Sequence, residues 1–436
     1  MTHTTATHSE ETKRFAGALE TMIIAGAFVF VLLGTYAKSF GDPAASRLAT
    51  VYALTEHGTF YIDPVDGVPN PFERATIDKV VVDGRMLSSK PPTIPLIMTA
   101  QYIVFRALFG WTLHDPDDVN YLILWMTMTF VGSCYVIGLV YFKRLVHLFT
   151  EDPITQVLLL FALAYGSQFW GYSINLNNHI PGAAMVIVSL FYALGLGTHR
   201  LTARPYRFML LGFSAGLVFA FDLPGVIFVA LAGLLVLWRY PRESLTYAAI
   251  AAAIPVGIHS GVLYATTGNP LPVQTNKDYY LYQTAYWRNP RGVDALNEPK
   301  GTYLFHMTFG RSGLFSLYPI MLLGIAGSVR ATLGRVKDEH RGLILGGLGA
   351  FLVLSLYYWN GTNNYGGESY GFRWYMVAMP VLLLMGIPVV ESLRKRWEWV
   401  FIGLMLGLSC YSAWECTSEP WRANQEWTIR FLGRTY

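Results

Sequence analysis

The segment FAGALETMIIAGAFVFVLLGTYA (residues 15–37) is followed by the polar sequence KSFGDP (residues 38–43), and the chain becomes apolar again after SSKPP (residues 88–92). The first segment is long enough to cross a bilayer as a helix, which takes about 20 apolar residues. It is too long for the apolar part of a signal peptide. The first polar loop of the chain therefore has an acid, Asp42, at one end and a lysine, Lys90, at the other.

The composition indicates a polytopic membrane protein. Of the 436 residues, 53% are hydrophobic and 14% are charged, whereas soluble domains are about a quarter charged. We predict an all-α fold with about eleven membrane crossings in a single transmembrane domain over residues 1–436. The spans predicted after the first one cover residues 118–142, 154–172, 180–197, 208–221, 224–238, 245–265, 314–332, 342–359, 375–392 and 398–416.

Basic residues predict the orientation, because short cytoplasmic loops carry an excess of Lys and Arg. The basic positions are Lys13-Arg14, Lys143-Arg144, Arg200, Arg204, Arg207, Arg239, Arg242, the segment from Arg330 to Arg341, and Arg394-Lys395-Arg396. With these inside, the longer loops predicted outside are the first loop (residues 38–91), an aromatic loop (residues 266–313) and a Gly-rich loop (residues 360–374).

The apolar segment of residues 92–110 does not fit this alternation, because only one net crossing is available between an outside Lys90 and an inside Lys143. We predict a re-entrant or interfacial helix here. The prolines at its start, Pro91, Pro92 and Pro95, suit an irregular entry where the backbone lines a cavity.

Two patterns within the first loop indicate a helix that follows Asp42. Asp42-Pro43 has the sequence of a helix N-cap followed by a first-turn proline. Residues 44–57 have the apolar spacing of an amphipathic helix on a membrane surface. Capping alone would explain Asp42, but an ionisable group at this depth is costly, which favours a function. Because a capping carboxylate can still face a cavity, the two roles are compatible.

Two further groups of residues are candidates for an anion site. A lone lysine at a membrane boundary usually extends to water, but the prolines after Lys90 restrict the backbone and suit phosphate binding. Asn178 and His179 belong to a polar cluster, NLNNH, at residues 175–179. This cluster either ends a helix or lines a polar pocket.

The two later outer loops also contain candidate residues. The aromatic loop is rich in Tyr and Trp, which suits sugar stacking as well as membrane-interface contact, and it ends near Arg311. The Gly-rich loop reads NYGGESYGFRWY at residues 364–375 and includes Glu368 and Tyr370. Its glycines allow close backbone approach to a ligand, and the planar fork of Arg373 matches phosphate. The alternative is a glycine turn with an interfacial arginine.

Together these segments resemble the GT-C superfamily of integral-membrane glycosyltransferases, in the bacterial branch similar to protein O-mannosyltransferases and lipid A aminoarabinose transferases. Asp42 matches the first-loop acid of that family, and SKPP at residues 89–92 matches its Lys-Pro-Pro motif. GLFSLYP at residues 313–319 and GGESYGFRW at residues 366–374 are similar to two later motifs. The resemblance covers most of the chain.

The sequence departs from the family pattern at three places. Pro43 follows Asp42 where a second acid is often found, Phe372 replaces the usual proline, and residues 177–179 read NNH where an Asp-x-Asp pair would stand in other members. The chain therefore does not look like a metal-dependent oligosaccharyltransferase. We predict no cofactor, and the use of a divalent cation is left open. The three cysteines, which show no zinc spacing, are interpreted as small hydrophobes.

The resemblance implies an inverting transfer of a sugar from a polyprenyl-phosphate donor to a lipid, glycan or protein acceptor. Asp42 would be the catalytic base, and Lys90 and Arg373 would bind the leaving phosphate. The other implied substrate-binding residues are His179, Asn178, Arg311, Glu368 and Tyr370. The implied location is the bacterial cytoplasmic membrane, with the site facing the periplasm or exterior.

Two other functions remain as alternatives. A secondary transporter or lipid flippase would place charges near the bilayer midplane, often in inverted repeats, whereas the polar residues here concentrate in the outer loops. A non-catalytic assembly or binding protein is the third hypothesis. Substrate uptake by proteoliposomes without a sugar donor would favour the transporter.

Overall fold

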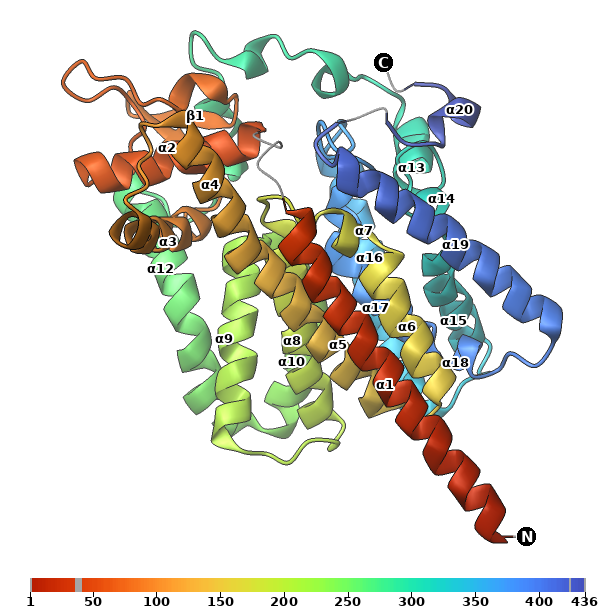
Figure 1. The fold of residues 1–436 in the computed structure, drawn as a ribbon. Helices are drawn as coiled ribbons and strands as arrows, with labels where there is room; N and C mark the ends of the chain where they lie inside the picture. The colour runs from red at the N-terminus through yellow and green to blue at the C-terminus, as the bar shows by residue number, and fades with distance from the viewer. Residues whose placement is uncertain (1, 36–40, 423–424, 435–436) are drawn as a thin grey trace.

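The structure, a computed structural model, describes residues 2–35, 41–422 and 425–434. The described chain is a bundle of helices with one small β-hairpin (Figure 1). The longer helices are α1 (Thr2–Gly34), α2 (Asp42–His57), α3 (Thr93–Phe109), α4 (Pro116–Met126), α5 (Ser133–Phe149), α6 (Pro153–Tyr165), α8 (His179–Gly197), α9 (Pro205–Phe221), α10 (Val226–Arg239), α12 (Ala249–Thr267), α13 (Lys300–Thr308), α15 (Leu322–Thr332), α16 (Asp338–Gly361) and α19 (Arg396–Ser418). Shorter helices are α7 (Gln168–Gly171), α11 (Pro241–Glu243), α14 (Leu314–Leu317), α17 (Met379–Met385), α18 (Ile387–Val390) and α20 (Ile429–Leu432).

The helical membrane architecture predicted from the sequence is confirmed. Among the described residues, seven helical segments are long and apolar enough to cross a membrane, and five shorter helices are also apolar. Each of the eleven predicted spans overlaps one of the seven or one of four of the shorter helices. The fifth shorter helix is α3, from the segment for which no full crossing was predicted. The number of crossings itself stays a prediction.

Helix α3 differs from the others in its direction. In Figure 1 it is viewed nearly along its axis, at the level of α2, while α1 and α9 run lengthwise through the bundle. It packs against α2 and α4. The re-entrant or interfacial placement expected for residues 92–110 stays a prediction.

Helix α2 is confirmed, but its predicted place on the membrane surface is wrong. All ten residues from Ala44 to Ala53 are buried, so the helix has no exposed polar face over that stretch. Other parts of the first loop cover it; for example, the Asn70 side chain donates a hydrogen bond to the Ala49 carbonyl (2.8 Å). The start of the loop, at Lys38, lies outside the described residues.

The first loop also forms a hairpin that was not predicted. Strand β1 (Lys79–Val82) pairs antiparallel with β2 (Arg85–Ser88). The two turn residues, Asp83 and Gly84, have φ angles of +49° and +76°. An Asp-Gly pair favours this left-handed turn because glycine carries no Cβ and Asp tolerates a positive φ.

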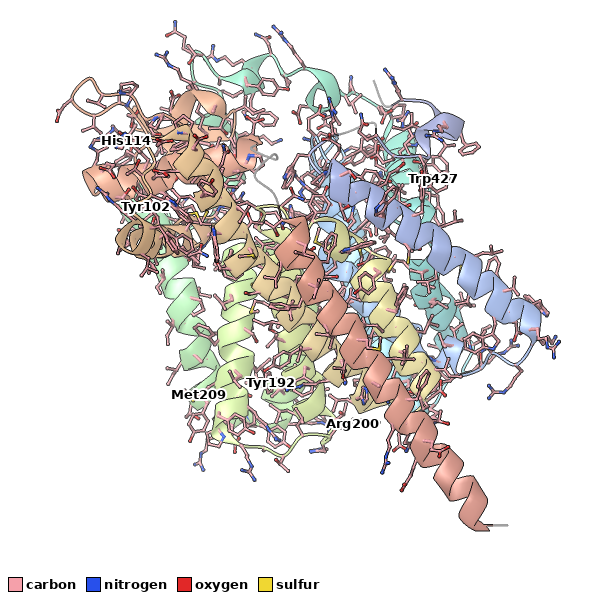
Figure 2. The ribbon with its side chains drawn as sticks, viewed as in Figure 1. Tyr102, His114, Tyr192, Arg200, Met209 and Trp427 are labelled. Carbon is pink, nitrogen blue, oxygen red and sulfur yellow. The ribbon has the colours of Figure 1, made fainter. Side chains whose placement is uncertain are left out.

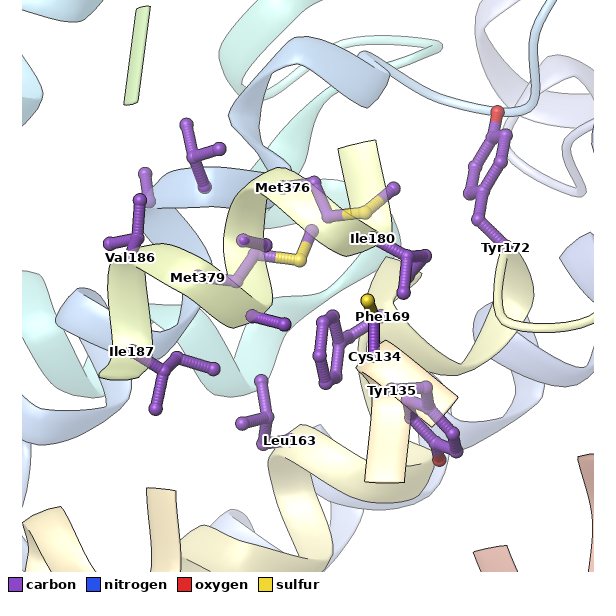
Figure 3. Close-up of a cluster of buried hydrophobic side chains, with 14 of the residues drawn as sticks. Cys134, Tyr135, Leu163, Phe169, Tyr172, Ile180, Val186, Ile187, Met376 and Met379 are labelled. Atoms are coloured by element: carbon purple, nitrogen blue, oxygen red, sulfur yellow. The ribbon is translucent and has the colours of Figure 1, made fainter. Parts of the chain in front are cut away.

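The core surrounds α8, which is buried along its length and packs against α5, α9 and α10. Figure 3 shows a part of it, where Cys134 and Tyr135 of α5 and Ile180, Val186 and Ile187 of α8 lie among apolar side chains of neighbouring helices. Cys134 is buried as a small apolar residue, as predicted. Helices α9 and α12 approach so closely that a Cβ at Gly216 would lie 2.6 Å from the Ala252 carbonyl oxygen.

The predicted outer loops lie at one end of the bundle, here called the site end. Figure 1 places the hairpin, α2, α13 and the C-terminal α20 at this end. Arg200, from a predicted inner loop, lies at the opposite end in Figure 2. Large apolar side chains on the outer helices are exposed, including Leu33, Trp238 and Trp397, as expected of helices that face lipid.

Candidate active site

A cavity of about 550 Å³ opens at the site end. The first loop, the aromatic loop, the Gly-rich loop and the C-terminal segment all contribute to its walls. Its ionisable lining residues are Asp42, Asp78, Lys90, Lys277, Asp294, Glu368 and Arg373. Its aromatic lining residues are Tyr280, Trp287, Trp374 and Trp421. Four of the predicted site residues, Asp42, Lys90, Glu368 and Arg373, therefore meet in one cavity.

Asp42 stands at the start of α2 but does not cap the helix as predicted. Gly41 is the N-cap residue, and no side chain caps the helix there. The Asp42 carboxylate instead accepts a hydrogen bond from the Ile77 backbone N–H (2.8 Å), and the Asp42 carbonyl accepts one from the Thr76 hydroxyl (2.8 Å). These bonds hold the carboxyl group across the loop, beside the cavity.

The surroundings raise the pKa of the Asp42 carboxyl group above its ordinary value. Burial is the largest cause, and the nearby Asp78 carboxylate adds to it, while the Ile77 N–H and the Lys90 ammonium act in the opposite direction. A raised pKa makes a carboxylate a stronger base, because the best catalytic pKa lies near the working pH. Asp42 is therefore suited to accept a proton.

The hairpin explains how Lys90 is held. The register of the strands places Lys79 opposite Ser88. Just beyond the strands, Asp78 lies opposite Ser89, whose N–H donates a hydrogen bond to the Asp78 carbonyl (3.0 Å). The side chain of Asp78 is then close to Lys90, and its Oδ2 lies 2.8 Å from Lys90 Nζ. Burial lowers the pKa of the Lys90 ammonium, and Asp78 opposes that shift.

The Gly-rich loop wraps around Arg373. Gly366 and Gly367 have φ angles of +94° and +78°, which L-residues with side chains rarely adopt. A Cβ at Gly366 would lie 3.3 Å from Arg373 Cγ. The guanidinium lies over the ring of Trp421, with Cζ 5.1 Å from the ring centroid. Arg373 Nε is buried without a hydrogen-bond partner among the described residues.

A layer of buried polar groups lies around the start of α8 and involves Asn178 and His179. The Arg47 guanidinium, 1% exposed, donates to the Pro43 carbonyl (2.9 Å) and to Asn178 Oδ1 (2.8 Å). His179 Nδ1 lies 2.8 Å from Asp222 Oδ2. Neither Asn178 nor His179 lines the cavity; Asn178 instead connects α2 to α8 through Arg47.

Arg47 is a further cation close to the cavity, in addition to Lys90, Lys277 and Arg373. Burial lowers the pKa of its guanidinium to about 10, the Asp78 carboxylate opposes the shift and Arg373 adds to it. The group stays charged at neutral pH. It therefore contributes to the positive potential near Lys90 and Arg373.

Arg311 and Tyr370, two predicted site residues, lie elsewhere. Arg311 Nη2 is 2.9 Å from Glu298 Oε1, and Nη1 donates to the Arg434 carbonyl (2.7 Å). Tyr370 is fully buried, and its hydroxyl donates to Glu415. Neither residue lines the cavity, and both fasten the Gly-rich loop and the aromatic loop to the C-terminal part of the chain.

Four residues of this region were not predicted from the sequence. Arg47 could have been noticed as a lone cation inside the apolar sequence AASRLA at residues 44–49. Asp78 lies two residues before a hairpin sequence, VVVDGR at residues 80–85. Asp294, which accepts a hydrogen bond from the Asn364 side chain (2.6 Å), and Trp421 show no local signal.

The acids of the cavity do not form a metal site. No group of three or more His, Cys, Asp or Glu side chains within residues 2–35, 41–422 and 425–434 is arranged to hold a metal ion. The Lys90 ammonium already provides the positive charge beside Asp78. These residues do not fit a divalent cation shared by Asp42 and Asp78, and we derive no step through one.

No protein-family description and no curated protein sequence matches the chain. Among solved structures, it is similar to the archaeal oligosaccharyltransferase AglB from Archaeoglobus fulgidus in complex with an inhibitory peptide and a dolichol-phosphate, at 14% identity, with a TM-score of 0.47, over 92% of this chain and 55% of that one. It is also similar to the Archaeoglobus fulgidus oligosaccharyltransferase tethered to an acceptor peptide, at 13% identity, with a TM-score of 0.48, over 90% of this chain and 55% of that one. The chain thus spans about half the length of these transferases.

Proposed function

We propose that this protein is an inverting glycosyltransferase that moves a sugar from a polyprenyl-phosphate donor to a hydroxyl group of a lipid, glycan or protein acceptor. The observation that carries the proposal is that Asp42, Lys90 and Arg373 line one cavity at one end of a bundle of apolar helices. An acid with a raised pKa and two cations match the two needs of the reaction, which are a base for the acceptor and positive charge for the leaving phosphate.

In the proposed reaction, the acceptor hydroxyl lies against Asp42, and the donor phosphate lies between Lys90 and Arg373. The acceptor oxygen attacks the anomeric carbon on the face opposite the phosphate, and its proton passes to the Asp42 carboxylate. The bond between the anomeric carbon and the phosphate oxygen breaks, and the phosphate keeps the electron pair. Lys90 and Arg373 stabilise the negative charge that it gains.

The walls of the cavity suit the two ends of such a donor. Tyr280, Trp287 and Trp374 offer aromatic faces for the sugar. Lys90 also lines a narrow cleft between α3 and α12, whose walls include Pro92, Pro95, Val262 and Leu263. A prenyl chain attached to a phosphate at Lys90 would have apolar surface beside it. The proposed location is the outer face of a bacterial cytoplasmic membrane.

The test is sugar transfer by the purified protein in nanodiscs, with a panel of radiolabelled polyprenyl-phosphate sugars and membrane lipid extract as acceptor. Asp42→Asn keeps an oxygen that can accept the Ile77 N–H, but it removes the base, so we expect transfer to fall by about 10²- to 10⁴-fold. Asp66→Asn is the matched control, because Asp66 is exposed at a turn in the same loop and does not line the cavity.

Two results would reject the proposal. Transfer by Asp42→Asn at the wild-type rate would remove Asp42 as the base. A folded wild-type protein that transfers no sugar from any donor, but accumulates a lipid or solute in proteoliposomes, would favour a transporter.

A further inference from the structure

The C-terminal segment, described for residues 419–422 and 425–434, lies at the site end after α19. Its path is fixed on both sides of Trp421. The Pro420 carbonyl accepts hydrogen bonds from the Tyr370 N–H (3.0 Å) and the Tyr172 hydroxyl (2.9 Å). Further along, Glu426 Oε1 accepts hydrogen bonds from the Gly371 N–H (2.9 Å) and the Ser312 hydroxyl (3.1 Å). Each of these two carbonyl or carboxylate groups thus binds a backbone N–H of Tyr370 or Gly371, which lie shortly before Arg373 in the Gly-rich loop.

Glu426 is an unusual anchor because its carboxyl group is buried, with 2% of the residue exposed. Burial raises the pKa of this group, while the Gly371 N–H and the Ser312 hydroxyl oppose the shift. Burying a carboxyl group is costly unless it is hydrogen-bonded, so a surface tail with no role would not be expected to contain one. The C-terminal segment is therefore held against the site end by buried hydrogen bonds and is not a loose tail.

The ring of Trp421 contacts three separate parts of the chain. It lies under the Arg373 guanidinium, at 5.1 Å, and it makes an edge contact with Tyr172, at 5.3 Å between ring centroids. A Cβ at Gly41 would lie 3.8 Å from the ring, so the ring also packs against the residue before Asp42. One side chain thus touches the cation on one wall of the cavity and the residue next to the acid on another.

We propose that Trp421 is a positioning residue that holds Arg373 for the phosphate of the donor. This inference rests on the proposed function. An aromatic face attracts a guanidinium without using its N–H groups, whereas a carboxylate would bind those groups and compete with phosphate. Arg373 Nε is indeed without a hydrogen-bond partner among the described residues. The ring therefore orients the cation without occupying its N–H groups.

A competing partner for Arg373 is Asp294, which lines the same cavity. A Cβ at Gly367 would be 4.0 Å from Arg373 Nη2 and 3.9 Å from Asp294 Oδ1. This acid is thus close to the guanidinium. Without Trp421, the guanidinium would be free to turn toward Asp294, and the carboxylate would then occupy N–H groups that the phosphate needs.

The experiment is a double-mutant cycle with farnesyl phosphate, a soluble prenyl phosphate, as the probe of binding. Trp421→Ala should weaken binding by about threefold to thirtyfold, the range of a partly buried cation–π contact. It should raise the donor KM more than it lowers kcat. Trp421→Phe should recover most of the binding, because the smaller ring still offers a face. Trp414→Ala is the matched control, since Trp414 is 57% exposed on α19.

The decisive measurement compares Arg373→Gln with the double variant that carries both Arg373→Gln and Trp421→Ala. If Trp421 acts through Arg373, Trp421→Ala should have little further effect on binding in that background. An equal loss of binding in both backgrounds, or no loss in Trp421→Ala, would overturn the proposal, as would a folded wild type that does not bind farnesyl phosphate. Binding that follows the predicted cycle without any sugar transfer would reject the proposed function and leave the role of Trp421 intact.

Discussion

The two ends of the bundle contain buried charges in opposite arrangements. At the end away from the cavity, Glu20 of α1 is 1% exposed, and its carboxylate lies 3.1 Å from Lys143 Nζ and 2.7 Å from His147 Nε2 of α5. Here the buried group is an acid, and its basic partners are partly exposed. At the site end one of the buried groups is a cation, Arg47, whose hydrogen bonds go to a backbone carbonyl and an amide oxygen.

The difference separates a structural cluster from a functional one. A buried charge with an opposite partner is compensated within the fold, whereas a buried cation that faces neutral oxygens keeps most of its desolvation cost. Such an arrangement is expected where a ligand supplies the missing charge. The Glu20 cluster joins α1 to α5, whereas under the proposed function Arg47 adds positive charge near the donor phosphate.

The largest expected effect concerns the pH dependence of transfer. Because the pKa of Asp42 is raised, the carboxyl group stays protonated up to a higher pH than an ordinary Asp, whose pKa is about 3.9. A protonated acid cannot act as the base, so kcat/KM should fall about tenfold per pH unit below a midpoint that lies above 3.9. The measurement is kcat/KM of transfer as a function of pH.

The control for this pH profile is Asp66→Asn. Its decrease of kcat/KM at low pH, the acid limb of the profile, should be the same as that of the wild type. An acid limb with a midpoint at or below the ordinary Asp value would contradict the raised pKa. The role of Asp42 as the titrating base would fail if the residual activity of Asp42→Asn showed the same limb.

A smaller effect is expected from Arg47→Met, which tests the site-end cluster directly. Methionine fills similar space without a charge, so the positive potential near Lys90 and Arg373 falls while packing is kept. We expect kcat/KM to fall by about tenfold to a hundredfold, somewhat less than the loss of a donor in direct contact with the reacting oxygen. The melting temperature should change little, because the lost hydrogen bonds are offset by the removal of a buried charge.

The proposed difference between the two ends would be wrong if Arg47→Met lowered the melting temperature but left kcat/KM per folded molecule unchanged. Arg47 would then be a structural residue, like those of the Glu20 cluster. Kinetics and thermal unfolding of the same nanodisc sample distinguish the two outcomes.

Sequence patterns were sufficient for the helical spans because a bilayer demands apolar segments of a minimum length, and each predicted span overlaps an apolar helix. They were also sufficient to predict that Asp42, Lys90 and Arg373 lie close together, because loops assigned to one membrane side can share a surface. The surface position of α2 was wrong because periodicity shows the apolar stripe of a helix but not what covers its other face. In this protein, the rest of the first loop covers it.

The contacts within the site depend on pairings that no local pattern contains. Asp78 reaches Lys90 only because the hairpin register fixes Lys79 opposite Ser88, although the Asp-Gly turn was visible in the sequence and would have predicted the hairpin. Trp421 reaches Arg373 only because the chain after α19 places this ring in the cavity wall. Tyr370 lay in a matching motif and Arg311 just before another, but their partners, Glu415 and Glu298, show that both residues hold the loops in place.

The smallest expected effect is that of Glu20→Gln, which tests the other side of the comparison. The amide keeps the shape of the side chain and removes the charge that compensates Lys143 and His147. Because both partners are partly exposed, at 28% and 38%, they can be hydrated, and we expect a loss of only about 1–2 kcal/mol in stability rather than the 3–5 kcal/mol of a fully buried pair. Thermal unfolding measures this loss. The kcat/KM of the folded fraction should stay within about twofold of the wild-type value, since the cluster lies at the end of the bundle away from the cavity. A clear fall in kcat/KM without loss of stability would show that the Glu20 cluster also contributes to transfer.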